Sequence, residues 1–581
     1  RAVTNEIFLN QFHLGFSGFH ILGGGFILGH QDIEKNESGS IAEANDKGQF
    51  HVVLKNSGVS AMHLQLMPNN KLIMFDAASL GKSDIQLAPG NCRTVPRTGA
   101  IDCYAHSVEY DPEANQVRAL KVNSLCTLIS RPIMLLLVFF KCKFKVLTDP
   151  WCSSGGLAPD GTLVSTGGWA DGEKSIRYIE GCDKCDWRES NIKLAENRWY
   201  ATQTLLADGR FVLIGGRGAF SYEFLAPEGQ PGSGRINLPF LFETADIYEN
   251  NLYPFVHLAP NGCCEFSILV DVKNNRIVKN YPDLPGGARN YPGSASSAML
   301  PIDLSQDNVD IEVLVCGGGQ PHAFGKAEKE GIYLPALDTC GRIKALVPNA
   351  QWEIEKMPSA RIMGDMLNLP NGEILLINGA QKGASGWQLA DDPNLTPVLY
   401  SPNKPAGQRF RILKGSNIPR MYHSSSAVLP DTKILVAGSN TNDGYRFKNV
   451  QFPTELRVEK FIPPYLDDKL DKFRPINVNL NTKLAVCGKQ IMLTCQFKGH
   501  ETVNQEDIMV TMYKPPFTTH GYSMNQRLVS LVISRFTPGL FGNYILQVQA
   551  PPKPELAPPG HYLIFVNNKG VPSTGSWIQL H

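Results

Sequence analysis

The sequence predicts an all-β protein in which a seven-bladed β-propeller is followed by an immunoglobulin-like β-sandwich. Three observations predict this fold class: many turn-forming residues, a hairpin pattern that recurs seven times, and a change of pattern near residue 463. Gly and Pro contribute 53 and 40 of the 581 residues. Such a composition favours many turns and short strands over long helices.

The recurrent unit is an apolar residue, a turn such as Pro-Asp-Gly, and a strand that ends in small residues, often Gly-Gly. An Asp-Gly or Asn-Gly turn reverses the chain into a hairpin, and the glycines let the strand end against a crowded axis. At roughly 50 residues per unit, this pattern is typical of kelch-type propeller blades. The seven units begin at Leu66, Leu157, Leu205, Leu258, Met299, Asn368 and Val428.

The changes of pattern divide the chain into three parts. We expect an ill-defined segment over residues 1–46, the kelch β-propeller over 47–463, and the immunoglobulin-like domain over 464–581. Beyond Pro463-Pro464 the glycine pairs stop, and alternating stretches such as KQIMLTCQF and HYLIFVNN favour a sandwich.

Two stretches depart from the repeat. Residues 122–145 change abruptly to apolar sequence without a turn, and their removal joins ordinary blade sequence. We interpret them as an aberrant insertion, a retained intron or a gene-model error; the alternative is a genuine surface insertion. The unit at Leu258 runs into Cys263-Cys264 without the usual strand and glycine pair, so its blade is predicted to have lost a strand.

Charge and hydropathy exclude several classes of partner. The chain carries 55 Lys+Arg against 54 Asp+Glu, a balance that argues against binding to nucleic acid or to a charged membrane surface. The longest apolar run, residues 132–140, is too short to span a membrane. We therefore expect no nucleic-acid partner, no membrane span and a monomeric protein.

The cysteines indicate the compartment. Four pairs are close enough in sequence to form disulfides, and Asn36 and Asn394 begin glycosylation sequons. The sequence thus favours a secreted, extracellular or cell-wall protein over a cytosolic one with scattered thiols. Cys182-Asp-Lys-Cys185 could also be half of a zinc site, but no second pair follows at finger spacing. The four pairs are Cys92/Cys103, Cys182/Cys185, Cys316/Cys340 and Cys487/Cys495.

Five residues of metal-site chemistry lie at predicted strand ends. Cys152 stands in WCSSGG, Tyr200 in NRWYAT, Tyr422 and His423 in IPRMYHSSS, and His520 in THGYSMNQR. Each alone would more often be a packing residue. Together with DCYAHSVEYD, and in this order on a seven-unit repeat, these segments resemble the glyoxal oxidase family of copper-radical oxidases, which is related to galactose oxidase.

The resemblance implies a site and a reaction. Copper would be bound by Tyr200, Tyr422, His423 and His520, and imidazole with phenolate suits Cu(II). Cys152 matches the family cysteine whose sulfur is bonded to the ring of Tyr200, which gives a thioether radical cofactor. Tyr422 matches the axial tyrosine that takes the substrate proton. The implied reaction converts small, glyoxal-like aldehydes to carboxylic acids, with reduction of O2 to H2O2.

Two alternative functions remain open. The first is oxidation of a primary alcohol or a sugar. In galactose oxidase a Trp stacks on the cross-linked Tyr, but the matching loop here, residues 215–220, contains no Trp. That difference favours an aldehyde substrate. The second alternative is a non-catalytic kelch binding protein.

The spacing around the two tyrosines predicts one local irregularity. Tyr200 precedes its turn residue Asp208 by eight residues, whereas Tyr422 precedes Asp431 by nine. Successive strand side chains point to opposite faces, so regular structure would not let Tyr422 and His423 both face the axis. We therefore predict a β-bulge at residues 421–424.

Other recurring residues are interpreted as structural. Arg198, Arg289, Arg361 and Arg420 recur at matching places in the repeat, and Trp169 is interpreted as a packing residue.

Overall fold

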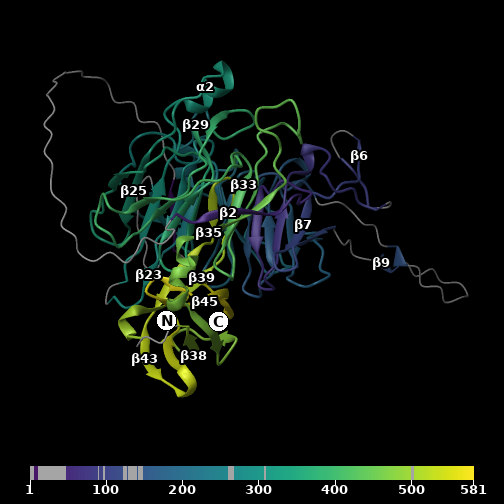
Figure 1. The fold of residues 1–581 in the computed structure, drawn as a ribbon. Helices are drawn as coiled ribbons and strands as arrows, with labels where there is room; N and C mark the ends of the chain where they lie inside the picture. The colour runs from purple at the N-terminus through teal and green to yellow at the C-terminus, as the bar shows by residue number, and fades with distance from the viewer. Residues whose placement is uncertain are drawn as a thin grey trace, which may run out of the picture.

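The computed structural model describes residues 6–10, 47–88, 91–95, 99–121, 127–128, 140–141, 148–259, 267–306, 309–498 and 503–581. These residues form seven antiparallel blades around one axis and a smaller β-sandwich on one side of the ring. The predicted fold class is therefore confirmed. In Figure 1 the yellow sandwich strands β38 and β43 lie on one side of the propeller, and helix α2 lies on the other.

Each blade contributes four strands, which follow one another from the axis outward. The first three blades are β3 (His63–Leu66), β4 (Leu72–Phe75), β7 (Ser107–Asp111) and β8 (Gln116–Ala119); β11 (Ser154–Leu157), β12 (Leu163–Thr166), β13 (Ile176–Ile179) and β14 (Arg188–Glu189); and β15 (Thr202–Leu205), β16 (Phe211–Ile214), β17 (Ser221–Leu225) and β18 (Ile236–Asn237). The inner strands are fully buried, which explains their almost continuous apolar and small residues.

The other four blades follow the same plan. They are β19 (Phe255–Leu258), β1 (Glu6–Asn10), β20 (Ser267–Asp271) and β21 (Arg276–Asn280); β22 (Ser296–Met299), β24 (Glu312–Cys316), β25 (Thr339–Lys344) and β26 (Glu353–Lys356); β27 (Asp365–Asn368), β28 (Ile374–Ile377), β31 (Val398–Tyr400) and β32 (Phe410–Ile412); and β33 (Ser424–Val428), β34 (Ile434–Gly438), β35 (Val458–Ile462) and β2 (Gln49–Leu54). Because β2 precedes the first blade in the chain, its pairing with β35 closes the ring.

The sandwich packs two sheets face to face. One consists of β36 (Pro475–Leu480), β38 (Gln490–Phe497), β44 (Asn543–Gln549) and β43 (Ile533–Pro538). The other consists of β23 (Ile302–Asp303), β42 (Arg527–Leu531), β39 (Ile508–Lys514), β45 (Gly560–Asn568), β47 (Ser576–Leu580) and β37 (Leu484–Ala485). The two α-helices are short, α1 (Pro239–Glu243) and α2 (Ala323–Glu330). No helix among the described residues is long and apolar enough to cross a membrane.

The fourth blade takes one of its strands from the start of the chain. Residues 255–280 contribute three strands, as expected for a blade that has lost one, and β1 fills the gap between β19 and β20. Ile7 lies opposite both Leu258 and Val270. The sequence did not predict β1, because a five-residue strand has no periodicity of its own and its partners lie in a distant part of the chain.

We expect this strand to stabilise the protein. A variant that lacks residues 1–10 would leave the facing edges of β19 and β20 without their backbone partners, so its melting temperature should fall by several degrees. A variant that lacks only residues 1–5 retains β1 and is the control. Equal melting temperatures for the two variants would contradict the role of β1.

Buried arginines hold the glycine turns in place. Arg198 Nη1 donates to Gly215 O at 2.8 Å, and Arg420 Nη1 donates to Gly438 O at 2.8 Å. Arg289 and Arg361 bind the equivalent carbonyls of Gly317 and Asn378. All four side chains are at most 3% exposed. Their interpretation as structural residues is confirmed.

A β-hairpin from the C-terminal domain enters the propeller along its axis. It consists of β40 (Phe517–Thr519) and β41 (Tyr522–Met524), and it leaves the sandwich between β39 and β42. β40 pairs with β3, with His63 opposite Thr519, and extends the first blade inward. The hairpin also contacts the inner strands β11, β15, β22, β27 and β33. Its turn therefore lies at the centre of the ring.

Three of the four predicted disulfides form: Cys92–Cys103, Cys182–Cys185 and Cys316–Cys340. The fourth prediction is wrong, because Cys487 and Cys495 are free thiols. Cys495 lies five residues into β38, roughly 16 Å from the start of that strand at about 3.3 Å per residue. Cys487 precedes β38, and its N–H bonds to His581 O beside the other sheet. The two Cα atoms cannot approach within the roughly 7 Å that a disulfide tolerates.

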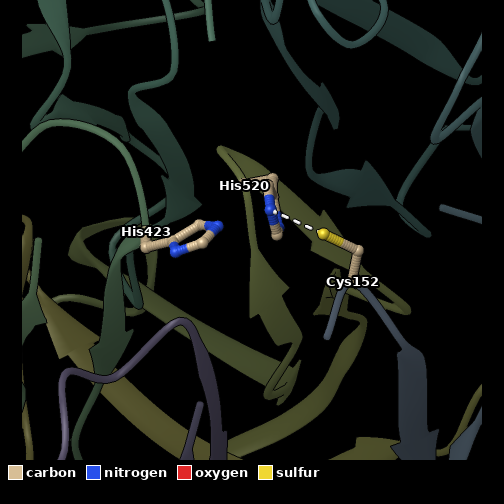
Figure 2. A group of neighbouring side chains, drawn as sticks. All are labelled: Cys152, His423 and His520. Carbon is tan, nitrogen blue, oxygen red and sulfur yellow. Dashed lines mark hydrogen bonds between the residues drawn. The ribbon is translucent and has the colours of Figure 1, made fainter. Parts of the chain in front are cut away.

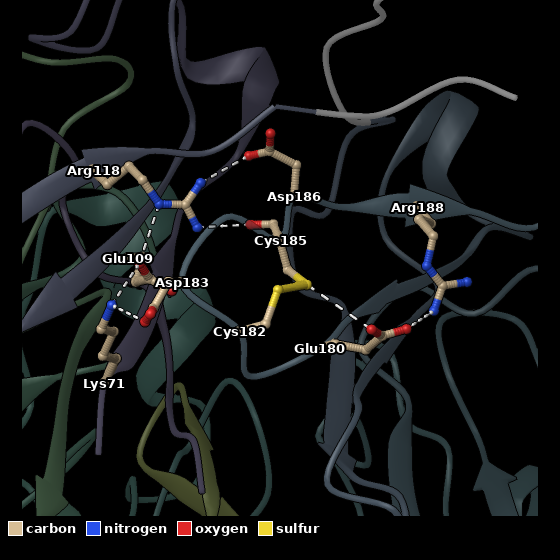
Figure 3. Close-up of a disulfide and its surroundings, with 9 residues drawn as sticks. All are labelled: Lys71, Glu109, Arg118, Glu180, Cys182, Asp183, Cys185, Asp186 and Arg188. Atoms are coloured by element: carbon tan, nitrogen blue, oxygen red, sulfur yellow. Dashed lines mark hydrogen bonds and ion pairs between the residues drawn. A yellow bond between two sulfur atoms is a disulfide. The ribbon is translucent and has the colours of Figure 1, made fainter. Parts of the chain in front are cut away.

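The Cys182–Cys185 disulfide stiffens a loop that joins two blades (Figure 3). The loop links β13 to β14 of the second blade, and its Asp183 accepts a bond of 3.0 Å from Lys71 of the first blade. Arg118, also from the first blade, donates to Asp186 and to Cys185 O. The disulfide interpretation is thus confirmed over the zinc half-site.

The apolar segment and the two sequons differ in how much of them the structure describes. Within residues 122–145 it describes only β9 (Thr127–Leu128) and β10 (Phe140–Lys141), which pair with each other. The rest of that segment lies outside the described residues, as does the sequon at Asn36. At the second sequon, Asn394 is 6% exposed and its amide donates to Ser359 Oγ and Ala360 O. The folded blade does not present this sequon to solvent.

Candidate metal centre

A repeated turn places side chains around the axis. In six of the seven blades, the residue just before the inner strand has left-handed backbone, with φ between 46° and 63°. This conformation is uncommon for residues other than glycine and tends to occur at functional sites. Backbone bonds tie neighbouring turns together, since Tyr200 N donates to Cys152 O at 3.1 Å and Tyr253 N to Tyr200 O at 2.9 Å. The six residues are Cys152, Tyr200, Tyr253, Ser294, Met363 and His423.

Three of the predicted site residues lie in this ring of turns, and a fourth lies inside it. Cys152, Tyr200 and His423 come from the second, third and seventh blades. His520 is the first turn residue of the axial hairpin and also has left-handed backbone, with φ of 49°. The propeller and the C-terminal domain therefore build the site jointly.

Cys152, His423 and His520 converge at the centre (Figure 2). Their potential metal-binding atoms all lie within 4.8 Å of one another, and all three residues are buried. Cys152 Sγ lies 3.3 Å from His520 Nε2. Thr519 Oγ1 lies 2.7 Å from His520 Nδ1, which fixes the ring and leaves Nε2 facing the site.

The two predicted tyrosine ligands are joined by a third tyrosine. Tyr200 donates a hydrogen bond of 3.0 Å to the hydroxyl of Tyr291, and the Tyr291 and Tyr422 hydroxyls also lie 3.0 Å apart. The rings of Tyr200 and Tyr422 lie 5.9 and 5.5 Å from that of His520, measured between centroids. The structure thus brings all five predicted site residues into one cluster.

The predicted bulge at residues 421–424 is wrong, and a turn takes its place. Ser424 N donates to Met421 O at 3.1 Å, and β33 begins only at Ser424. Tyr422 and His423 both belong to this turn, so the alternation of strand side chains does not apply to them. In the repeat, His423 is equivalent to Tyr200, both with φ of 63°, and Tyr422 is the extra residue before it.

Burial sets the protonation states of the cluster. It lowers the pKa of His423 and of His520 well below the ordinary value, so both imidazoles are neutral and can bind a metal. It raises the pKa of Tyr200 and Tyr422 well above the usual range. Ionisation of these phenols in place therefore requires a cation close by.

The cluster has the unmet bonding capacity of a metal site. Both ring nitrogens of His423 are buried, and neither has a hydrogen-bond partner in the part of the chain that the structure describes. Buried polar atoms are normally paired, and such exceptions call for an explanation. A metal bound at His423 Nε2 or Nδ1 supplies one, and two imidazoles with two phenol oxygens suit Cu(II).

Sequence reasoning missed Tyr291, the residue that bridges the two tyrosines. Its ring stacks on that of Tyr200 at 4.4 Å between centroids, with an interplanar angle of 30°. It lies in a longer connection of the fifth blade, between Arg289 and Ser294, where the other blades have fewer residues. That extra length in NYPGS was the signal that could have identified it.

Four tryptophans extend from the other side of Tyr200. Trp199 lies 4.8 Å from the Tyr200 ring and 4.1 Å from Trp169, between centroids. Trp151 contacts both Trp169 and Trp199 and stacks on Trp387 at 5.0 Å. Trp169 is therefore a packing residue, as predicted.

The loop that lacks the galactose-oxidase tryptophan contacts this cluster from outside. Its Arg217 guanidinium lies over the Trp199 ring at 5.1 Å. Its Phe220 packs on Phe242 instead of on Tyr200. The ring stacked on Tyr200 thus comes from Tyr291, in a different blade.

Comparisons with known proteins agree with this architecture. The family model described as glyoxal oxidase N-terminus matches residues 62–131 and 140–465, and the galactose oxidase-like Early set domain matches residues 474–580. A solved fungal alcohol oxidase of the AA5 family, in complex with copper, shares the fold with a TM-score of 0.63 and 16% identity. The match covers 92% of this chain and 99% of that one.

Several relatives are much closer in sequence. Aldehyde oxidase GLOX1 of Arabidopsis thaliana is 46% identical over 550 residues, which cover 93% of this chain and 85% of the relative. Aldehyde oxidase GLOX of Vitis pseudoreticulata is 39% identical over 93% of this chain and 98% of its own length. Galactose oxidase of Gibberella zeae is 22% identical over 74% of this chain and 61% of its own. The chain belongs to the glyoxal oxidase family of copper-radical oxidases.

Proposed function

We propose that the protein oxidises small aldehydes such as glyoxal to carboxylic acids and reduces O2 to H2O2 at a copper ion held by Tyr200, Tyr422, His423 and His520. The observation that carries the proposal is the convergence of these donors around His423, whose ring nitrogens have no partner among the described residues. The names of the aldehyde oxidase relatives support the substrate class.

We further propose that Cys152 and Tyr200 become joined by a thioether bond. Cys152 is fully buried and lies beside the Tyr200 side chain, which influences its pKa. Formation of the bond removes the thiol hydrogen and one ring hydrogen, and O2 with bound copper accepts the two electrons. Sulfur on the ring makes one-electron oxidation of the Tyr200 phenol easier.

The protein side chains then have distinct tasks in the reaction. Bound copper supplies a Lewis acid and a one-electron acceptor. The phenolate oxygen of Tyr422 accepts the O–H proton of the hydrated aldehyde. The oxidised Tyr200 accepts the C–H hydrogen at its Oη. Tyr291 holds the two phenol oxygens through its own hydroxyl, and Trp199 with Tyr291 excludes water from the Tyr200 ring.

The substrate proposal is tested by comparing glyoxal with galactose and a simple primary alcohol in a peroxide-release assay on copper-loaded protein. We expect peroxide from glyoxal at a rate at least tenfold above the other two. Faster turnover of galactose would favour the alternative of a sugar oxidase. Copper-loaded protein that releases no peroxide with any of them would favour the non-catalytic kelch binding protein.

Tyr291→Phe should separate the bridging hydroxyl from the stacked ring. The variant retains the ring but loses both phenol hydrogen bonds, so kcat with glyoxal should fall roughly 10- to 100-fold while copper remains bound. The optical spectrum of the oxidised protein should shift, because Tyr200 loses its hydrogen-bond acceptor. Tyr400→Phe, in β31 of the sixth blade, is the control. An unchanged kcat and spectrum for Tyr291→Phe would contradict the bridging role.

We also propose that the protein is secreted, to the cell exterior or cell wall, and acts as a monomer. Three disulfides support an oxidising compartment. All donors of the site come from one chain, so a second copy is not needed to complete it.

A further inference from the structure

Two cations face each other where the axial hairpin leaves the sandwich. Lys514 ends β39 and Arg527 begins β42, and the two residues are direct partners in this antiparallel pair. Lys514 is 2% exposed and Arg527 is 5% exposed. Like charges at directly opposed positions repel each other, and burial strengthens this repulsion.

Neither cation has a carboxylate partner among the described residues. Arg527 donates to three main-chain oxygens, those of Leu258, Glu555 and Leu556. Lys514 Nζ has no hydrogen-bond partner in the described part of the chain, and it lies 5.3 Å from the centre of the Tyr562 ring. An aromatic face offsets only part of the cost of burying an ammonium group.

The electrostatic consequences extend to a third basic group. Burial and the neighbouring Arg527 charge lower the pKa of Lys514 to about 7. The same two causes lower the pKa of His257 to about 3. The local surroundings are thus positive and lack a compensating negative charge from the described side chains.

A small cavity opens at this place. Its volume is about 20 Å³, and Lys514, Arg527, His257, Thr204 and Gln526 contribute to its lining. This is enough room for one particle of about the size of a water molecule. The Thr204 hydroxyl is also buried without a hydrogen-bond partner among the described residues. An ammonium group and a hydroxyl with unused donor capacity therefore line the same cavity.

We propose that this cavity binds a single halide ion, which neutralises the Lys514–Arg527 pair at the base of the axial hairpin. The size of the cavity limits the ligand to a monatomic or similarly small anion, and its lining offers hydrogen-bond donors and positive charge. A polyatomic anion such as phosphate or sulfate is too large. The site lies outside the metal centre, on the neck of the hairpin that carries His520.

Thermal unfolding tests the proposal with sodium bromide as the probe. Bromide replaces gluconate at constant ionic strength, so that general screening stays unchanged. The melting temperature of the wild-type protein should rise by a few degrees as bromide increases, because a ligand of the folded state stabilises it by mass action. Lys514→Met should lose this dependence. Lys460→Met, which removes a half-buried lysine from β35, should retain it.

Crystals soaked in sodium bromide provide a measurement that does not depend on the variant. The proposal expects an anomalous bromine peak within contact distance of Lys514 Nζ. A water molecule in the cavity with no anomalous peak would overturn it. A bromide dependence of the melting temperature that is the same in wild-type protein and Lys514→Met would also overturn it.

Discussion

Cys152→Ala is expected to bind copper and to lose the oxidase reaction. The variant keeps the four proposed ligands but cannot form the thioether, so the Tyr200 phenol becomes harder to oxidise. We expect kcat with glyoxal to fall by roughly 10³-fold, in the range seen when a residue that acts only in the reaction is removed. The absorption of the oxidised Tyr200 should be missing as well. Copper content, peroxide release and the visible spectrum measure these effects.

A second buried thiol provides the control for this variant. Cys495 is also free and fully buried, but it lies in β38 of the sandwich, away from the site. Cys495→Ala creates a similar small cavity and should leave the spectrum and kcat unchanged. If Cys152→Ala retained the wild-type spectrum and activity, the proposed cofactor would be wrong.

Asn525→Ala is expected to weaken both folding and copper binding. The Asn525 side chain accepts a bond of 2.7 Å from Leu205 N and donates to Gly155 O and Gln203 O, both at 3.1 Å. It thereby fixes the axial hairpin to the second and third blades. Its φ of 66° also suits Asn better than Ala. The loss of these bonds leaves buried backbone groups unpaired, at a cost of about 3 kcal/mol in the free energy of unfolding.

The effect on copper follows from the position of Asn525 in the chain. Asn525 is five residues from His520, and the hairpin between them is held in the ring partly by this anchor. We expect the affinity for copper to fall at least tenfold. Urea unfolding and a competitive copper titration measure the two effects. Asn477→Ala, which changes an exposed residue of β36, is the control. Wild-type stability and copper affinity in Asn525→Ala would show that the anchor is unnecessary.

The repeat made much of the fold predictable, and it failed where the chain pairs over long distances. Turn and glycine patterns mark each blade because the same local hairpin recurs seven times. Glu6–Asn10 escaped prediction because a strand inserted into a distant blade carries no local signal. The Cys487/Cys495 prediction failed because proximity in sequence along an extended strand is not proximity in space.

The candidate site was predictable in its members and unpredictable in its geometry. The resemblance to a known family selected Cys152, Tyr200, Tyr422, His423 and His520, and the structure brings all five together. The turn that presents Tyr422 with His423 could not be derived from strand periodicity, because both residues lie outside the strand. Tyr291 carries no motif, and only its position between Tyr200 and Tyr422 reveals it.

Peptide mass spectrometry of wild-type protein, digested before and after treatment with copper and O2, tests the proposed cofactor without any substitution. We predict that the peptide with Cys152 and the peptide with Tyr200 appear as one cross-linked species after treatment, lighter than their sum by the two lost hydrogens. We also predict that this species does not form without copper. Two separate peptides after treatment, in protein that has bound copper, would contradict the proposed Cys152–Tyr200 cofactor.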